Sequence, residues 1–366
     1  MLIGIDGTMF TKHKTGIANY GYELLCRLPQ FMPNAKFIIF SPNPPPADWA
    51  LDPEKFRWTT QCHFYEKPMI AYKAFGMAMA AAREKIDIFW AVAGVAPFFM
   101  PCPVLLTVYD YTYLLEAQSM PLQRRIFRTL NQPYWTRRAA KVNAISAAVA
   151  EETQRYIGRK VDSIIRPSVD QSFYPRGNDE IEHVKSKYGI DREYYLIVGT
   201  LEPRKNLQLF LETYMEQIAL AKKTPPVLVI SGSSGWKTGP ILELIDHGVQ
   251  HGWLKAIGYA DFSDLPALYS GAELLFMPSR YEGFGMPILE ARMCGCKVVC
   301  SDVAAMREAG GSTSYYHAPD KQGILDALAH VFSSASTDVS ASIPSIDWSW
   351  ESGARQLAGE LQAMMR

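Results

Sequence analysis

The sequence predicts an α/β fold with two domains, each built on a parallel β-sheet that helices cover on both faces. The chain has 366 residues, which suits about two domains of ~100–200 residues. Short apolar runs alternate with longer helical patterns along most of the chain, as in proteins with parallel sheets. The apolar runs form two series, separated by the polar stretch 166–177, where Pro167, Pro175 and Gly177 are typical of a linker.

Each series predicts the strands of one domain. The first series predicts strands at 2–6, 36–41, 87–91, 104–109 and 141–145. The second predicts strands at 195–198, 227–230, 256–259, 274–277 and 297–300. Most of these residues are apolar, as expected for strands that helices bury on both faces. Helical patterns such as 17–28 and 207–221 lie between the strands.

Composition excludes some classes of protein. The chain carries 37 basic and 37 acidic residues, whereas a nucleic-acid-binding protein usually has a basic excess, so we expect no nucleic-acid partner. Six cysteines in a chain of this length do not indicate a disulfide scaffold. Cys294, Cys296 and Cys300 lack the spacing of a zinc site, and we expect them to be small buried residues. We therefore expect no metal.

The sequence predicts a cytoplasmic protein. Met1 leads directly into an apolar strand, without the basic region and cleavage site of a signal peptide. The uncharged segment 88–109 contains Pro97, Pro101 and Pro103, which favour two strands and a loop over a membrane-spanning helix. Contact with the inner face of the cell membrane stays open, and the sequence does not indicate an oligomeric state.

The strongest motif for chemistry follows the predicted strand 274–277. Gly283 and Gly285 allow a tight turn that approaches a ligand closely, and Pro287 suits the first position of a helix. The helix N-terminus would bind phosphate. Glu282 and Glu290 flank this turn, and carboxylates accept hydrogen bonds from the diols of a sugar or ribose. A nucleotide sugar has both parts. The alternative is a glycine-rich turn with an acid that caps the helix.

A second motif follows the predicted strand 195–198. The strand ends at Gly199, and we expect Asn206 to cap the next helix. Arg204 and Lys205 in the intervening loop would lie at the carboxyl edge of the sheet and neutralise a leaving diphosphate. The alternative is a solvated pair of surface cations.

Two weaker features lie in the first domain. Gly16 would let backbone N–H groups approach a phosphate, although the full dinucleotide fingerprint is absent. Asp110 follows Tyr109 at a strand end and is placed to meet a sugar or acceptor hydroxyl; an aspartate that merely shapes the turn is the alternative. The histidines are scattered, and His247 and His251 lack the acid of the HExxH motif.

Together these motifs resemble glycosyltransferase family four, whose members have the GT-B fold of two Rossmann-like domains facing a deep cleft. The resemblance rests on VGTLEPRKNL at 198–207, PS at 278–279 and EGFGMPILEA at 282–291, where two glutamates have seven residues between them. Weaker matches are GIANY at 16–20, NAIS at 143–146, GY at 258–259, LY at 268–269 and WSW at 348–350. The chain looks most like mannosyl or rhamnosyl transferases that assemble bacterial O-antigen or capsule.

The resemblance implies a domain division and a set of residue roles. The N-terminal, acceptor-side domain would comprise 1–168 together with the returning helix 350–366, and the nucleotide-sugar domain would comprise 169–349. Arg204 and Lys205 would hold the diphosphate, Glu282 the sugar hydroxyls and Glu290 the ribose. These three catalytic candidates, Arg204, Lys205 and Glu282, would act without a metal or other cofactor. The remaining candidates for donor binding are Gly16, Gly199, Phe284, Gly285, Met286 and Pro287.

Two positions depart from the family pattern. Tyr109 precedes Asp110 where many relatives have a histidine that touches the donor sugar, so sugar contacts and acceptor choice are open. At the interdomain strand, Pro167-Ser-Val-Asp170 replaces the usual Pro-Asn-Gly-Val-Asp, a change that affects the linker turn.

The function that the resemblance implies is a retaining transfer of a hexose. Retention is expected on one face of the sugar, with the leaving phosphate oxygen taking the acceptor proton. The expected donor is GDP-mannose or a GDP-linked rhamnose-type sugar, and the acceptor a saccharide or lipid-linked saccharide. Three alternatives stay open: a UDP-sugar-dependent transferase, a phosphorylase or epimerase on the same fold, and a non-catalytic protein that binds nucleotide sugars.

Overall fold

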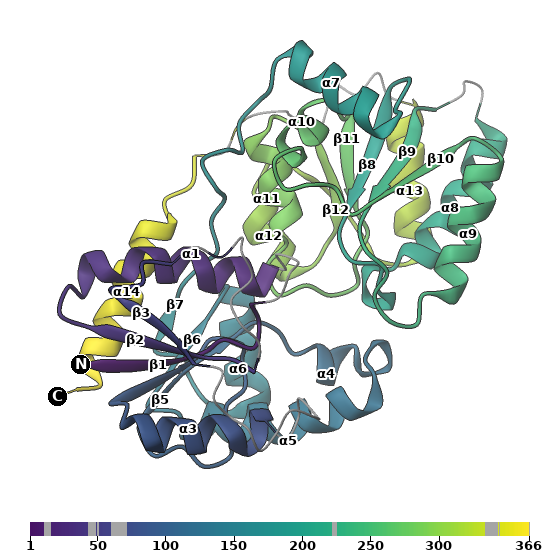
Figure 1. The fold of residues 1–366 in the computed structure, drawn as a ribbon. Coiled ribbons are helices and arrows are strands. Elements are labelled where there is room, and N and C mark those ends of the chain that lie inside the picture. Colours follow the sequence, from purple (N-terminus) through teal and green to yellow (C-terminus); the bar gives the residue numbers. More distant parts are fainter. Residues whose placement is uncertain are drawn as a thin grey trace. The chain divides into compact units, whose positions relative to one another are not determined.

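A computed structural model describes residues 1–10, 16–42, 49, 51–59, 72–221, 225–333, 343 and 345–365. These residues form two compact units, which are described one at a time (Figure 1). Unit 1 comprises Met1–Leu114, Leu122–Ser168 and Asp347–Arg366. Unit 2 comprises Val169–Ile346 and also Leu115–Pro121, which the sequence analysis counts with the first domain.

Unit 1 contains a seven-stranded sheet in the order β3-β2-β1-β4-β5-β6-β7, in which all paired strands are parallel. The strands are β1 (Leu2–Asp6), β2 (Lys36–Phe40), β3 (Phe56–Thr59), β4 (Ile88–Ala91), β5 (Val104–Val108), β6 (Lys141–Ala144) and β7 (Ser163–Ile164). Five of these seven match predicted strands to within one residue. The order around β1 is that of a Rossmann-like sheet.

Helices cover both faces of this sheet. Helices α1 (Gly16–Phe31) and α14 (Trp350–Ala363) lie together on one face, and α3 (Met77–Glu84) and α5 (Leu122–Arg138) lie on the other (Figure 1). Helix α6 (Ala147–Ile157) packs beside α5. The shorter elements are η1 (Tyr72–Gly76) and α4 (Thr112–Leu115), while η2 (Ala117–Ser119) falls in the segment assigned to unit 2.

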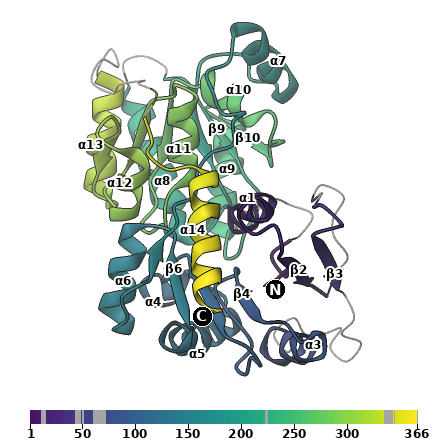
Figure 2. The same ribbon diagram turned by 90° about the vertical axis from the view of Figure 1, so that its left-hand side faces the viewer.

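The last helix completes unit 1. Leu357 and Leu361 of α14 are fully buried, and the Trp350 ring lies 5.8 Å from that of Tyr20 on α1. Figure 2 shows α14 in yellow beside α1. The chain therefore returns to the first unit, as the resemblance implies.

Unit 2 contains a six-stranded parallel sheet in the order β10-β9-β8-β11-β12-β13. The strands are β8 (Tyr194–Val198), β9 (Val227–Ser231), β10 (Leu254–Gly258), β11 (Leu274–Met277), β12 (Val298–Ser301) and β13 (Tyr315–His317). Helices α8 (Leu207–Leu220), α9 (Gly239–Gln250) and α13 (Lys321–Ser333) cover one face (Figure 1). Helices α10 (Leu265–Ser270), α11 (Met286–Met293) and α12 (Ala304–Gly310) cover the other, with α7 (Asn178–Tyr188) beside α10.

The topology of unit 2 brings the two strongest motifs together. Strand β8 lies between β9 and β11, so the chain leaves it toward one side and later returns on the other. At such a switch point the loops after the two central strands lie at the same edge of the sheet but run in opposite directions, which leaves room for a ligand between them. The loop after β8 carries Arg204 and Lys205, and the loop after β11 carries Glu282. Among the described helices, none combines the length and the apolar character needed to cross a membrane.

Candidate functional site

The loops after β8 and β11 are fixed to each other by their backbones. The Arg280 N–H donates to the Arg204 carbonyl at 2.9 Å. The Arg280 guanidinium also donates to the Asn206 side-chain oxygen at 3.1 Å, and the Asn206 amide donates to the Pro319 carbonyl at 3.0 Å. Asn206 is the residue before α8, but it has a left-handed conformation (φ 59°) and makes no capping bond. The prediction that its side chain caps the helix is wrong, because the side chain joins three loops instead.

Arg204, Lys205 and Glu282 form one ion cluster. Arg204 Nη1 lies 2.7 Å from Glu282 Oε2, and Lys205 Nζ lies 2.7 Å from Glu282 Oε1. Glu202 accepts a second bond from Arg204 at 2.9 Å, and the Ser279 hydroxyl donates to Glu282 at 2.9 Å. The side chains of Arg204 and Lys205 are 20% and 13% exposed, so the alternative of a solvated surface pair is wrong.

The cluster keeps Glu282 ionised. Burial by itself would raise the pKa of Glu282, but the charges of Arg204 and Lys205 and their hydrogen bonds outweigh burial and lower the pKa to about 2. The carboxylate therefore neutralises the two cations while no other anion is present. A diphosphate that binds the same cations would compete with Glu282 for them.

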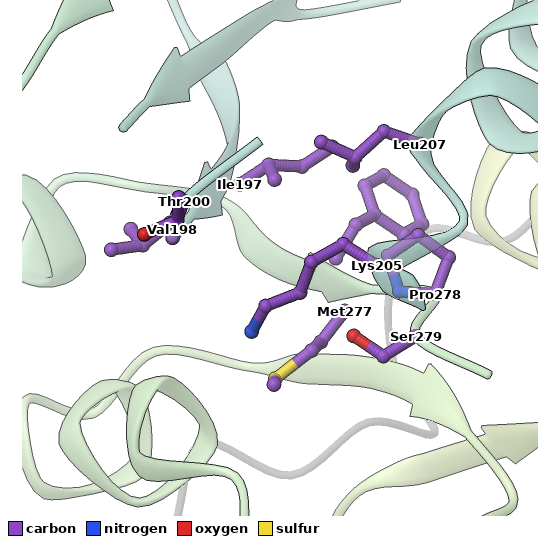
Figure 3. Close-up of a pocket in the computed structure, with 10 residues that line it drawn as sticks. Ile197, Val198, Thr200, Lys205, Leu207, Met277, Pro278 and Ser279 are labelled. Carbon is purple, nitrogen blue, oxygen red and sulfur yellow. The ribbon is translucent and has the colours of Figure 1, made fainter. Parts of the chain in front are cut away.

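Glycines let the backbone pack closely around the cluster. Gly199 has a φ of 141°, which side-chain-bearing residues rarely adopt, and a Cβ there would lie 3.4 Å from Lys205 Nζ. A Cβ on Gly232, after β9, would lie 1.9 Å from the Gly199 carbonyl oxygen. Beside Gly199 is a small cavity into which the Lys205 side chain extends, between the end of β8 and Met277 (Figure 3).

Helix α11 begins at the glycine-rich turn. Gly285 precedes it with a φ of 108°, and Met286 is its first residue, so Pro287 occupies the second helical position rather than the predicted first. Phe284 is buried and holds the turn against the core. Of the two glycines in the turn, Gly285 has the positive φ that favours glycine, and Gly283 does not.

Glu290, on α11, is the second of the two predicted carboxylates. The Tyr269 hydroxyl donates to it at 2.8 Å. Burial raises the pKa of Glu290 to about 7, since the Tyr269 hydrogen bond and the more distant charge of Lys205 lower the pKa by less than burial raises it. Near neutral pH, Glu282 is therefore ionised, whereas Glu290 is able to take up a proton.

The candidates in unit 1 lie at the carboxyl edge of its own sheet. Asp110 accepts a bond from the Thr112 N–H at 3.0 Å, which is the turn-shaping bond of the alternative reading. Tyr109 is buried, and its hydroxyl has no hydrogen-bond partner among the described residues. Burial raises the pKa of Tyr109 well above its usual range, so the phenol stays protonated. Gly16 is the exposed first residue of α1, and residues 11–15 before it lie outside the described ranges.

The sequence analysis assigned no role to several side chains that complete these sites. Ser279 and Tyr269 each bond to one of the two glutamates. Asp6, at the end of β1, is fully buried and accepts two bonds from Thr8, while its Oδ2 has no partner within the described residues. Its position as an acid that ends a predicted strand could have singled it out. In the described part of the chain, no three His, Cys, Asp or Glu side chains form a group able to hold a metal ion.

The fold and this site define a class of protein. Residues 192–334 match the model of the family "Glycosyl transferases group 1", and this range contains every site candidate of unit 2. Unit 2 therefore carries a domain of that family. Solved structures agree on the fold: sucrose-phosphate synthase from Thermosynechococcus elongatus aligns with 99% of this chain and 94% of its own, at a TM-score of 0.69 and 16% identity.

A relative and a second structure refine the comparison. The O-antigen chain mannosyltransferase B of Escherichia coli is 33% identical over 204 residues, which are 55% of this chain and 52% of that protein. The chain thus spans about half the length of this relative. HepE from Anabaena, in complex with UDP and glucose, covers 98% of this chain and 94% of its own, with a TM-score of 0.69 and 16% identity. The two units of this chain have the GT-B fold.

Proposed function

We propose that this protein is a retaining glycosyltransferase that moves a hexose from a nucleoside-diphosphate sugar to a saccharide or lipid-linked saccharide. The transfer would serve the synthesis of a surface polysaccharide. One observation carries the proposal: Arg204 and Lys205 meet the carboxylate of Glu282 within a glycosyl transferases group 1 domain. A pair of cations next to a carboxylate suits a ligand that carries both a diphosphate and hydroxyl groups.

The reaction would begin with an exchange of anions. The donor diphosphate takes the place of the Glu282 carboxylate on Arg204 and Lys205, because it offers more negative charge to the same two cations. Glu282 is then free to accept hydrogen bonds from the donor sugar. As the bond to the sugar breaks, the two cations stabilise the charge that grows on the leaving diphosphate. The acceptor oxygen bonds to the anomeric carbon on the face that the diphosphate leaves, and the leaving phosphate oxygen takes the acceptor proton, so no protein nucleophile is needed.

GDP-mannose, or a GDP-linked rhamnose-type sugar, is the proposed donor. The relative that supports this choice is named an O-antigen chain mannosyltransferase. A UDP-sugar is the second candidate, since HepE was solved with UDP and glucose. The reaction would take place in the cytoplasm or at the inner face of the cell membrane.

The test is binding of GDP, UDP, ADP, dTDP and their sugars, read as a rise in the thermal unfolding temperature. A ligand specific for the folded state stabilises it by RT ln(1 + [L]/Kd). We expect GDP and GDP-mannose to give the largest shifts and transfer to follow when a saccharide acceptor is added. A shift with UDP alone would favour the second donor. Turnover of donor without acceptor would favour a phosphorylase or epimerase, and no shift with any nucleotide would contradict the proposed site.

The transfer is proposed to need no metal, because Arg204 and Lys205 supply the positive charge that a divalent ion provides elsewhere. We therefore expect transfer to continue in EDTA at its rate without the chelator. If activity fell in EDTA and returned with Mg²⁺ or Mn²⁺, the two cations would not be sufficient for the diphosphate.

A further inference from the structure

Helix α5 has an inverted distribution of side chains. Leu122, Ile126 and Leu130 are 67%, 52% and 61% exposed, although each is aliphatic. Their spacing of four residues places them in one stripe along the helix. The buried residues of the same helix are mostly polar and lie on its opposite face: Asn131, Gln132, Trp135 and Thr136. A helix of a soluble domain normally turns its aliphatic residues toward the core.

Polar contacts hold α5 in this orientation. The Asn131 side chain forms two hydrogen bonds with the backbone of Ala96, accepting from its N–H at 3.2 Å and donating to its carbonyl at 2.7 Å. Gln132 donates to the Asp110 carbonyl at 2.9 Å, and the Trp135 indole donates to the Ala96 carbonyl at 3.0 Å. Rotating the helix to bury its aliphatic stripe would break all four bonds, so the stripe is held outward.

A neighbouring loop extends the exposed apolar area. Phe98 packs its ring 6.3 Å from that of Phe127 and 5.8 Å from that of Tyr134, both on α5. Phe99, the next residue, is 75% exposed. We call Phe99, Leu122, Ile126 and Leu130, together with Arg125 and Arg137, the α5 surface. It lies on the face of the sheet opposite to α1 and α14 (Figure 1).

The charges on α5 are all of one sign. Its 17 residues include five arginines and no acid, although the whole chain is neutral. Arg125 and Arg137 are exposed, and Arg137 follows Leu130 by seven residues, which continues the stripe. Within the described ranges, no carboxylate pairs with Arg125 or Arg137. An exposed aliphatic stripe accompanied by unneutralised arginines suits a surface that is both apolar and anionic.

We infer that the α5 surface binds an anionic lipid membrane. The aliphatic and aromatic side chains would enter the interface between headgroups and acyl chains, and the arginines would contact lipid phosphates. A second copy of this chain fits less well, because a symmetric contact would bring two sets of arginines together. The inference goes beyond the proposed transfer reaction and does not depend on it, although Gln132 ties α5 to the Asp110 turn, where a lipid-linked acceptor would be near the membrane.

The test is co-sedimentation of the full chain with vesicles. We expect binding to vesicles of phosphatidylcholine mixed with phosphatidylglycerol, much weaker binding to phosphatidylcholine alone, and release at high salt. The double variant Ile126→Ser, Leu130→Ser should bind the vesicles roughly tenfold more weakly or worse. The double variant Arg125→Gln, Arg137→Gln should weaken binding by roughly 25-fold, since each arginine near a charged surface contributes about a factor of five.

A matched control removes two exposed aliphatic residues elsewhere. Leu220 and Val249 are 77% and 48% exposed on α8 and α9 of unit 2, and replacing both with serine should leave vesicle binding unchanged. Unaltered thermal unfolding of each variant would show that the fold is intact. Equal binding by wild type and the Ile126/Leu130 variant would overturn the inference, as would equal binding to neutral and anionic vesicles. A dimer that this variant splits, with no vesicle binding by wild type, would make the surface a protein interface instead.

Discussion

At the scale of single residues, the site stores its own counter-ion. Glu282 pairs with both Arg204 and Lys205 and fixes their direction, so that in the proposed reaction the two cations are ready for an incoming anion. Such preorganised charge costs little rearrangement when the leaving group develops its charge. The cluster also predicts that Arg204 and Lys205 share one task rather than acting separately.

Replacing Arg204→Ala tests this shared task. We expect turnover to fall by a factor of about 10²–10³, as for the loss of a donor that stabilises transition-state charge. Arg204→Lys should recover only part of the loss, because a lysine lacks the forked geometry that contacts two oxygens. The measurement is the initial rate of sugar transfer at saturating donor. Arg355→Ala, on the exposed side of α14, is the control and should leave the rate unchanged. A near-normal rate in Arg204→Ala would remove this residue from the diphosphate site.

Glu290 predicts a pH dependence of nucleotide binding. A carboxylate accepts hydrogen bonds from both hydroxyls of a ribose, whereas the protonated form accepts fewer. Because the pKa of Glu290 is about 7 in the folded protein, we expect nucleotide affinity to weaken as the pH falls below 7, by up to about tenfold per pH unit. The measurement is titration calorimetry between pH 8 and pH 6, and Glu290→Gln should bind with no such slope.

The same raised pKa affects stability with a defined sign. Between the ordinary value of 4.5 and about 7, the folded protein retains a proton that the unfolded chain has lost. The free energy of unfolding therefore falls as the pH rises through this interval, and the part due to Glu290 should be absent in Glu290→Gln. An identical pH profile of unfolding in both proteins would contradict the raised pKa.

The sequence could predict which residue types gather here, but not all of their partners. Arg204, Lys205 and Glu282 come together because β8 and β11 are neighbours in a parallel sheet, and the strand pattern predicts the strands but not this order. The left-handed conformation of Asn206 could not be predicted, because its partners Arg280 and Pro319 are distant in sequence. The sequence allowed two interpretations of Asp110, contact with a sugar or acceptor hydroxyl and shaping of the turn. Only the fold shows that its carboxylate accepts a hydrogen bond from the Thr112 N–H.

At the scale of elements, glycines decide how closely the loops of unit 2 approach. The carbonyl of Gly199 lies where a Cβ on Gly232 would be, so the turns after β8 and β9 touch backbone to backbone. The Arg204 loop begins at this contact. The position of the Arg204 loop therefore depends on Gly232, which makes no contact with the ligand in the proposed mechanism.

Replacing Gly232→Ala should push the Gly199 turn away. We expect a loss of about 1–3 kcal/mol in the free energy of unfolding, as for overpacked sites, together with weaker nucleotide binding. Urea unfolding and thermal-shift titration measure the two effects. Gly239→Ala is the control, since a Cβ on that residue, the first of α9, would meet nothing within 4 Å. If both variants kept wild-type stability and affinity, the close contact would have no role in placing the loop.

Long apolar strands were predictable and short ones were not. β3 contains an exposed arginine, β7 has two residues and β13 has three, so none of them shows the apolar run that identifies a buried strand. All three lie at or near the edges of their sheets, where one side of the strand needs no partner. Their order in the sheet follows from the chain topology rather than from their own residues.

At the scale of the whole molecule, the C-terminal helix is part of the core of unit 1. Leu357→Ala should cost about 2–5 kcal/mol in the free energy of unfolding, because the leucine is fully buried on the inner side of α14 and its loss leaves a cavity. Chemical unfolding followed by tryptophan fluorescence would measure it. Gln356→Ala, at an exposed position of α14, should change the free energy of unfolding by less than about 0.5 kcal/mol. A small effect of Leu357→Ala would mean that α14 is not needed to stabilise unit 1.

This return of the chain has a consequence during synthesis. Unit 1 is interrupted between Ser168 and Asp347, so the ribosome makes nearly all of unit 2 before it makes the helix that covers α1. At a translation rate of ~5–20 residues per second, the delay between Ser168 and Asp347 lasts on the order of ten to forty seconds. During that time unit 1 can assemble its strands but leaves the apolar side of α1 uncovered. We therefore expect the apolar side of α1 to be open to chaperone binding or aggregation until α14 has been synthesised.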